Sequence, residues 1–419
     1  MHFNLVGLNH STAPVTLREK AAVRVEKLCD SLSLLRQYVP HGVILSTCNR
    51  TEVYTLGNHP AEEVGIDLLN IMTDISSINL LPHIYLRENE TAFGHLFRVA
   101  SGLDSMIVGE YEILGQVRQA LEAAERAKML NPPLRHIFQS AIRTGRRARE
   151  ETGISKNAVS VSSVAVDLAE RVVGDLKECK VVVIGAGEAG RLVVKVARER
   201  GASRIAIASR TKDRALTIAE SLGGIPIDLN NLVEELITTD IVVTCAGAPH
   251  RILHVPHLEE TMQKRAELPL VIIDIAVPRD VDPEVRQIRN IFLYDIDDLT
   301  EISEINRKQR EGEIQMTKEI IAAEVSTLVF WWRALEVSPL VSALMRKAEE
   351  IRRAQLNKTL KKLRPLSDEE RDGLEAMTKS IVTKILREPI GYLKANTKSN
   401  RGYAEMVSEL FRLDREREE

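Results

Sequence analysis

The sequence predicts a chain of three blocks: an α+β block, an α/β block with a doubly wound parallel sheet, and an all-α block reached through a long helix. Short strand patterns mixed with helical patterns fill residues 1–157, and apolar strands alternating with helices fill 158–300. From 301 to 419 the spacing of apolar residues is helical. A length of 419 residues suits this division, because domains hold roughly 150 residues each. These ranges are therefore the expected domains.

The first block is expected to open with a strand at Phe3–Leu8 and a helix at Arg18–Arg36. Two strands within Gly42–Leu56 follow, joined near Cys48. The second half of the block has the three-to-four-residue apolar spacing of helices at Thr91–Ser101, Gln116–Met129 and Pro133–Glu150.

The second block repeats short apolar strands, a pattern typical of parallel sheets that are covered on both faces. They are Lys180–Ile184, Arg204–Ala208, Asp240–Thr244, Leu270–Asp274 and Ile291–Tyr294. The third block starts with a long helix from beyond Asp298 to about Leu335, which Pro339 is expected to end. Helices at Leu340–Leu363 and Leu374–Leu386 are expected after it.

The apolar face of the long helix favours a homodimer, because such a face on a protruding helix needs a partner. A helical domain with solvated charges is the alternative.

The net charge of -3 argues against a protein whose whole surface binds nucleic acid, and we expect no DNA partner. We expect no signal peptide and no apolar run of about 18 residues, hence no membrane partner and a cytoplasmic protein. The four cysteines form no C-x-x-C pair, so no metal is expected.

A glycine-rich turn follows the first strand of the second block and opens a helix. This is the context that a G-x-G-x-x-G dinucleotide motif requires. At the end of the next strand a serine and an arginine stand where an NAD-selective fold usually has an acid, so NADPH is favoured over NADH. A solvated arginine is the alternative. The expected cofactor-binding residues are Gly185, Ala186, Gly187, Glu188, Ala189, Gly190, Ser209 and Arg210.

A polar cluster around Cys48 closes an apolar strand, which indicates a site. A cysteine beside an arginine and hydroxyl groups can have a depressed pKa, and a thiolate is a strong nucleophile. Spacing alone leaves an inert buried cysteine as the alternative. A second polar-rich stretch, from His95 to Gln116, has small and polar residues between two helices, and Gly102, Gly109 and Gly115 permit close approach of backbone to a ligand. An ordinary loop is the alternative there.

At these residues the chain resembles the glutamyl-tRNA reductase family over nearly its whole length. The resemblance rests on Gly7–Val15, Leu45–Glu52, Arg98–Val117, Gly185–Gly190, Ser209–Thr211 and Asp274–Asp280. It implies an N-terminal catalytic domain that binds glutamyl-tRNA, an NADPH domain of the Rossmann type and a helical dimerisation domain on a spinal helix. It also implies the first committed step of tetrapyrrole biosynthesis, the reduction of glutamyl-tRNA(Glu) to glutamate-1-semialdehyde with release of tRNA.

The resemblance further assigns roles to single residues. Cys48 is implied as the nucleophile that forms a glutamyl thioester, and His95 as a second catalytic residue of unassigned role. Arg50 is implied as the partner of the glutamate side-chain carboxylate and Glu110 as that of the α-ammonium. Glu112 is a departure, because many members have glutamine there. The implied substrate-binding residues are Thr47, Asn49, Arg50, Ser105, Glu110, Tyr111, Glu112 and Gln116.

The resemblance implies docking with glutamate-1-semialdehyde aminomutase, and hydride transfer over ~3–3.5 Å requires the two sites to close on each other. A basic helical region from Arg135 to Arg149 is a candidate tRNA surface, and Arg346–Arg364 is a second candidate. A solvated or ion-paired surface is the alternative. An NADP-dependent dehydrogenase similar to shikimate dehydrogenase and a non-catalytic binding protein are the other functions considered.

Overall fold

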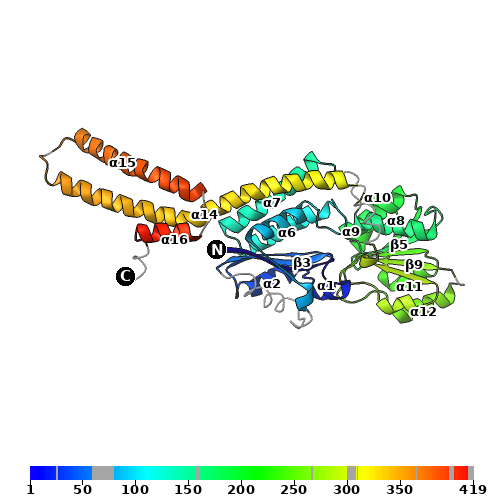
Figure 1. Cartoon of the computed structure of the whole chain (residues 1–419). Helices are drawn as coiled ribbons and strands as arrows, with labels where there is room; N and C mark the ends of the chain where they lie inside the picture. Colours follow the sequence, from blue (N-terminus) through cyan, green and yellow to red (C-terminus); the bar gives the residue numbers. More distant parts are fainter. Residues whose placement is uncertain are drawn as a thin grey trace. The chain divides into compact units, whose positions relative to one another are not determined.

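The computed structural model describes residues 1–24, 27–58, 80–155, 160–265, 268–299, 308, 310–364, 366–395 and 401–413 (Figure 1). The chain divides into two compact units, Met1–Val325 and Ser326–Glu419. The first unit holds both sheets and the second unit is helical.

The first sheet is antiparallel and contains β1 (His2–Asn9), β2 (His41–Ser46), β3 (Arg50–Gly57) and β4 (Tyr85–Glu88) in the order β2-β3-β1-β4. The predicted strands are present, and β4 is an addition. In the register of β1 and β3, Asn9 lies opposite Arg50 and His2 opposite Gly57. The turn from β2 to β3 therefore lies at the end of the sheet where β1 finishes.

The predicted helix Arg18–Arg36 is wrong as a single element. The structure has α1 (Val15–Ala21) and α2 (Leu28–Leu35), and Ala22 between them is extended. The N–H of Val23 donates to Ser46 Oγ at 2.9 Å. A tertiary hydrogen bond thus takes a donor that a continuous helix would use.

The other helices of the first block follow the expected ranges closely. They are α5 (Asn89–Ala100), α6 (Glu112–Arg126) and α7 (Pro132–Glu151). Asn131 caps α7 by accepting from the N–H of Leu134, and Pro132 occupies the first helical position, which suits a residue with no N–H. Helix α5 contacts β1, and α6 contacts β2.

The second sheet is parallel and doubly wound, as predicted. It contains β5 (Lys180–Ile184), β6 (Arg204–Ala208), β7 (Ile225–Ile227), β8 (Ile241–Thr244), β9 (Leu270–Asp274) and β10 (Ile291–Asp295). Their order is β10-β9-β8-β5-β6-β7, so the winding reverses between β5 and β8. Ligands of such folds bind at this reversal, beyond the carboxyl ends of the strands.

Helices cover both faces of this sheet (Figure 1). Alternate strand residues such as Val181 and Val183 pack with α8 (Val161–Val173), α9 (Glu188–Glu199) and α10 (Lys212–Leu222). Their neighbours Val182 and Ile184 pack with α11 (Leu232–Leu236) and α12 (Val255–Lys264) on the other face. Burial on both faces explains why these strands are apolar throughout.

The second unit contains most of α14 (Glu311–Leu360), together with α15 (Asp368–Ala395) and α16 (Arg401–Leu410). The prediction that Pro339 ends the long helix is wrong, because Pro339 lies inside α14. Val337 and Leu344, on either side of the proline, are both buried, and this packing stabilises a helix that has lost one backbone hydrogen bond.

Helix α14 also corrects the expectation about apolar runs. Among the described residues it is the one helix that is long and apolar enough to cross a membrane, judged by length and composition only. Length and composition do not distinguish such a span from a helix whose apolar stripe packs on protein.

Candidate active site

Cys48 lies in the turn from β2 to β3, and Thr47 shapes this turn. The Thr47 hydroxyl accepts from the N–H groups of Asn49 and Arg50 at 3.1 and 3.2 Å, and the Thr47 N–H donates to the Arg50 carbonyl at 2.8 Å. Arg18 of α1 donates from Nη1 to the Cys48 carbonyl at 2.7 Å. The Cys48 side chain is half-buried, so the turn presents a thiol at the edge of a packed region.

The Cys48 thiol is neutral in this arrangement, which corrects the expectation of a depressed pKa. Burial and, after it, the negative charges of Glu110 and Glu112 together raise the pKa of Cys48 to about 12, against an opposing effect of Arg18. The arginine expected to activate the thiol was Arg50. The structure pairs the Arg50 guanidinium with Glu52 instead, at 2.7 Å.

Glu52 is the centre of a buried hydrogen-bond network. Its carboxylate accepts from Arg50, from the hydroxyls of Tyr54 and Tyr85 at 2.6 Å each, and from His95 Nε2 at 2.8 Å. These partners hold the pKa of Glu52 well below its usual range although burial opposes them. Glu52 was not predicted as a site residue. A charged residue in a strand with apolar neighbours was the available signal.

The network fixes the surroundings of Arg50 and His95. Arg50 is 1% exposed and also donates to the Asp104 carbonyl. His95 Nδ1 lies 3.4 Å from Asp104 Oδ2. His95 thus contacts Glu52 and Asp104, and within the described part of the chain no hydrogen bond joins it to Cys48.

The second predicted stretch forms a loop between α5 and α6 that carries Ser105, Glu110 and Tyr111. Gly109 adopts a φ of +84°, and a Cβ there would lie 1.9 Å from the Ile154 carbonyl oxygen, so only glycine fits. The Tyr111 hydroxyl donates to the Ser155 carbonyl at 2.5 Å, while its ring is 61% exposed. The loop is therefore anchored on the segment that follows α7.

Two carboxyl groups of this region have raised pKa values. Burial raises the pKa of Glu110, and the neighbouring Ser105 hydroxyl opposes this. Burial raises the pKa of Glu112 to about 7, with added repulsion from Glu110 and from Glu188 of the glycine turn. Gln116, one turn further along α6, is half-buried. Two carboxyl groups that could bind a positively charged group thus lie near Cys48.

The glycine turn lies at the winding reversal, between β5 and α9. Gly185 has a φ of +124°, and a Cβ on Gly190 would lie 1.9 Å from the Gly185 carbonyl oxygen. Nothing lies within 4 Å of a Cβ on Gly187, which leaves its backbone open to a ligand. Glu188, Ala189 and Gly190 form the first turn of α9, whose N–H groups suit a phosphate.

A cavity of about 150 Å³ adjoins this turn and reaches the end of β6. Gly185, Ala186, Gly187, Ser209 and Arg210, five of the residues expected to bind the cofactor, line it. It is also lined by residues that were not predicted, Thr211, Arg214 and Cys245 among them. The residues present therefore fit a nicotinamide dinucleotide.

The Cys48 turn and the glycine turn pack against the same apolar core. Val15, Met106 and Ile107 of the first block belong to the same buried cluster as the strands of the second sheet. Cys48 and Ala186 both pack against this cluster. The Cys48 turn and the glycine turn thus share one apolar cluster as their support.

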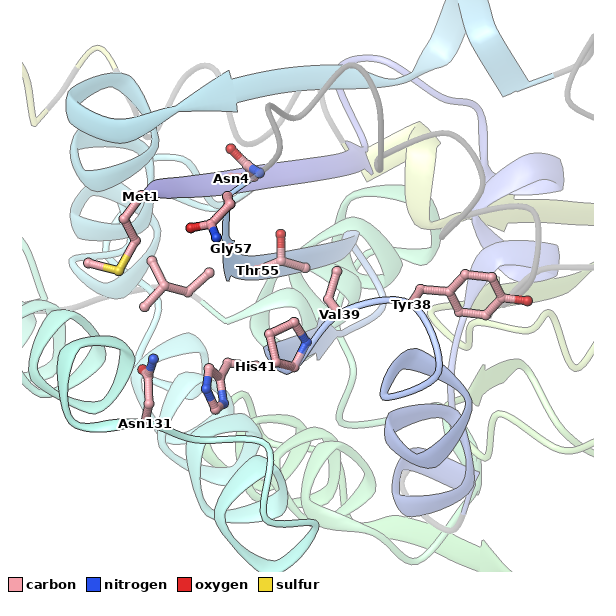
Figure 2. A pocket seen from close by; sticks show the side chains of 11 residues that line it. Met1, Asn4, Tyr38, Val39, His41, Thr55, Gly57 and Asn131 are labelled. Atoms are coloured by element: carbon pink, nitrogen blue, oxygen red, sulfur yellow. The ribbon is translucent and has the colours of Figure 1, made fainter. Parts of the chain in front are cut away.

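A larger cavity, of about 390 Å³, lies at the opposite end of the first sheet (Figure 2). The side chains of Met1, Asn4, His41, Thr55 and Asn131 surround it. None of the predicted site residues lines it. Because His2 and Gly57 pair at this end and Asn9 and Arg50 at the other, the length of β1 separates this cavity from Cys48.

Several arginines of the basic helical region form ion pairs or hydrogen bonds with other residues of the chain. Arg135 pairs with Glu125 at 2.7 Å, and Arg147 pairs with Glu151 and Glu324. Arg149 donates to backbone carbonyls, including that of Glu110 at 3.0 Å. In the second candidate region Arg352 and Arg353 share Glu349. Arg135, Arg147, Arg352 and Arg353 are thus ion-paired, whereas Arg149 is held by backbone carbonyls.

Comparisons with known proteins cover the whole chain. The sequence profile of the glutamyl-tRNA(Glu) reductase N-terminal domain matches residues 6–152, and that of the dimerisation domain of the same enzyme matches 316–413. A shikimate/quinate 5-dehydrogenase profile matches 167–302. The glutamyl-tRNA reductase of Carboxydothermus hydrogenoformans is 40% identical over 100% of this chain and 94% of the relative. The chain belongs to the glutamyl-tRNA reductase family.

Other members of the family agree with this assignment. The glutamyl-tRNA reductase of Natranaerobius thermophilus is 36% identical, over 98% of this chain and 92% of that protein. The solved glutamyl-tRNA reductase from Methanopyrus kandleri is 36% identical, covers 98% of both chains and has a TM-score of 0.52. The chain is thus an oxidoreductase with a dinucleotide-binding fold. The match at 316–413 includes most of α14, so the apolar stripe of that helix belongs to a dimerisation region.

Proposed function

We propose that this reductase converts glutamyl-tRNA(Glu) to glutamate-1-semialdehyde with NADPH, through a thioester on Cys48. The observation that carries the proposal is the packing of the Cys48 turn and the glycine turn on one core. Hydride transfer needs the donor within ~3–3.5 Å of the acceptor carbon, and support of both turns on one cluster favours such an approach.

The first step is an acyl transfer to Cys48. The thiol sulfur attacks the ester carbonyl carbon, the bond from this carbon to the tRNA ribose oxygen breaks, and that oxygen takes the thiol proton. The result is a glutamyl thioester and free tRNA. Covalent capture divides a difficult reduction into two easier steps.

The high pKa of Cys48 suggests how the substrate assists this step. Glu110 and Glu112 raise the pKa of the thiol by their negative charge. The α-ammonium group of the glutamyl ester, bound at Glu110, offsets that charge and lowers the thiol pKa when substrate is in place. Free enzyme then keeps a neutral, unreactive thiol. Ser105, Tyr111, Glu112 and Gln116 complete the proposed pocket around the aminoacyl group.

Arg50 is proposed to bind the glutamate side-chain carboxylate with the N–H groups that Glu52 and Asp104 do not use. Thr47 and Asn49 shape the turn around it. His95 is proposed to act through Glu52, which it holds against Arg50. A cytoplasmic location, docking with the aminomutase and the domain limits 1–157, 158–300 and 301–419 stay predictions.

The second step is the reduction of the thioester. Gly185–Gly190 with Ser209 and Arg210 are the residues proposed to hold NADPH, which would supply the hydride for this step when bound. The thioester carbon accepts the hydride, its oxygen takes a proton, and the resulting hemithioacetal collapses. The carbon–sulfur bond breaks, the aldehyde leaves, and the sulfur is reprotonated.

Intact-protein mass spectrometry tests the proposal. The enzyme is mixed with glutamyl-tRNA without NADPH, the modified peptide is mapped, and NADPH is then added. We expect a glutamyl adduct on Cys48 that disappears as semialdehyde is released, and no adduct on Cys48→Ser. If intact glutamyl-tRNA and NADPH both bind but wild-type enzyme forms no adduct, a non-catalytic binding protein or a small-metabolite dehydrogenase is favoured instead.

A further inference from the structure

Arg18 of α1 connects the Cys48 turn to the nucleotide-binding block. It is 2% exposed, and its Nε donates to the Ala13 carbonyl at 3.1 Å. Its Nη1 donates to the Cys48 carbonyl at 2.7 Å. Its Nη2 pairs with Asp297, in the 3-10 turn Ile296–Leu299 that follows β10. One guanidinium thus contacts both the Cys48 turn and the nucleotide-binding block.

A second set of contacts supports the same junction. The N–H of Val15, the first residue of α1, donates to the other Asp297 oxygen at 3.0 Å. Glu19 accepts from Arg279 Nη2 and Nε at 2.9 and 3.0 Å. Asp297 and Arg279 both lie in the 167–302 region, while α1 lies in 6–152. Consecutive residues of α1 therefore carry two ion pairs to the nucleotide-binding block.

The two ion pairs of this junction require contact between α1 and the nucleotide-binding block. A buried guanidinium that loses its carboxylate partner is strongly destabilised, whereas a docked one is compensated. Without Asp297 beside it, the guanidinium that holds the Cys48 carbonyl would lose its compensating charge. The position of Arg18, and with it that of the Cys48 turn, therefore depends on contact with the nucleotide-binding block.

We propose that Arg18 and Asp297 form a docking latch that positions the Cys48 turn for hydride transfer. The latch rests on the proposed function, because it concerns the same thioester. It assigns different roles to its two members. Asp297 lies in the nucleotide-binding block and positions the Cys48 turn for the reduction of the thioester. Arg18 holds this turn in both half-reactions. Both are positioning residues, since neither supplies a reacting atom.

The test separates the two half-reactions in Asp297→Asn, with Asp298→Asn as the matched control. Asp298 is the next residue and undergoes the same change of charge, but it pairs with Arg286 inside the nucleotide-binding block. Adduct formation on Cys48 is followed by mass spectrometry without NADPH. The preformed adduct is then chased with NADPH, and NADPH affinity is measured separately by its fluorescence.

We expect Asp297→Asn to form the adduct and to bind NADPH within about twofold of wild type, while its chase slows about tenfold or more, as expected for a misplaced reactant. Asp298→Asn should behave as wild type in all three assays. Arg18→Met should slow both adduct formation and chase. Equal loss in both half-reactions of Asp297→Asn, or a chase at the wild-type rate, would overturn the latch. Failure of wild-type enzyme to form any adduct would instead contradict the proposed function.

Discussion

At the scale of single residues, the environment of Cys48 differs most from what its neighbours in sequence suggest. Arg50 stands two positions away, yet its charge is compensated by Glu52. Glu110 and Glu112, about 60 positions along the chain, act on the thiol instead. A pKa depends on distances in space, so the nearness of Arg50 in sequence predicted a lowered thiol pKa where the structure raises it.

Glu112→Gln should make Cys48 more reactive, because it removes a negative charge that raises the thiol pKa. The pKa of Glu112 is about 7. Below that pH Glu112 is mostly neutral, and both proteins should alkylate at similar rates. Above it the variant should react about three to ten times faster, from a pKa change of up to one unit.

Iodoacetamide labelling of free enzyme, mapped to the Cys48 peptide between pH 6 and 9, measures this effect. Glu122→Gln is the control, because Glu122 lies on an exposed face of the same helix. Its labelling should follow wild type throughout. Identical rates for Glu112→Gln and wild type at pH 8.5 would contradict the assigned cause of the high thiol pKa.

At the scale of elements, strand ends carry the chemistry and the strands position it. The β2–β3 turn presents Cys48, and the ends of β5 and β6 present the glycine turn and Arg210. These elements were predictable because period and composition report local structure. The break between α1 and α2 was not predictable, since a hydrogen bond from Val23 to Ser46 decides it.

Arg210→Ala should reduce affinity for NADPH by about 10- to 100-fold, the cost of one charge-assisted phosphate contact, and change NADH affinity less than about threefold. Titration of cofactor fluorescence measures both constants. Lys212→Ala is the control, because it removes one positive charge nearby from a side chain that pairs with Asp228. A parallel loss of NADPH and NADH affinity would show that Arg210 does not select the 2′-phosphate.

At the scale of the whole molecule, the helical unit leaves apolar side chains exposed within a single chain. Met377, Ile381, Ile385 and Tyr392 of α15 step along one face, and each is about half-exposed or more. Exposed apolar stripes on helices indicate a missing partner. The match to a dimerisation domain identifies that partner as a second copy.

Ile385→Glu should therefore weaken the dimer, because it places a carboxylate in an apolar interface. We expect the dissociation constant to rise at least about 100-fold, which corresponds to about 2.7 kcal/mol. Light scattering after size-exclusion chromatography over a dilution series measures it. Thr383→Glu introduces the same charge on the opposite face of α15 and should remain dimeric. A dimeric Ile385→Glu variant would exclude this face from the interface.

The sequence by itself determined the three-block architecture, the strands of the parallel sheet, the glycine turn and the family, because these depend on local periodicity and on contiguous motifs. Only the tertiary structure decided which charges meet. It paired Arg50 with Glu52, placed Glu110 and Glu112 against Cys48, and joined Arg18 to Asp297 across 279 positions. Electrostatic interactions follow distance and burial in space, and neither is encoded by position along the chain.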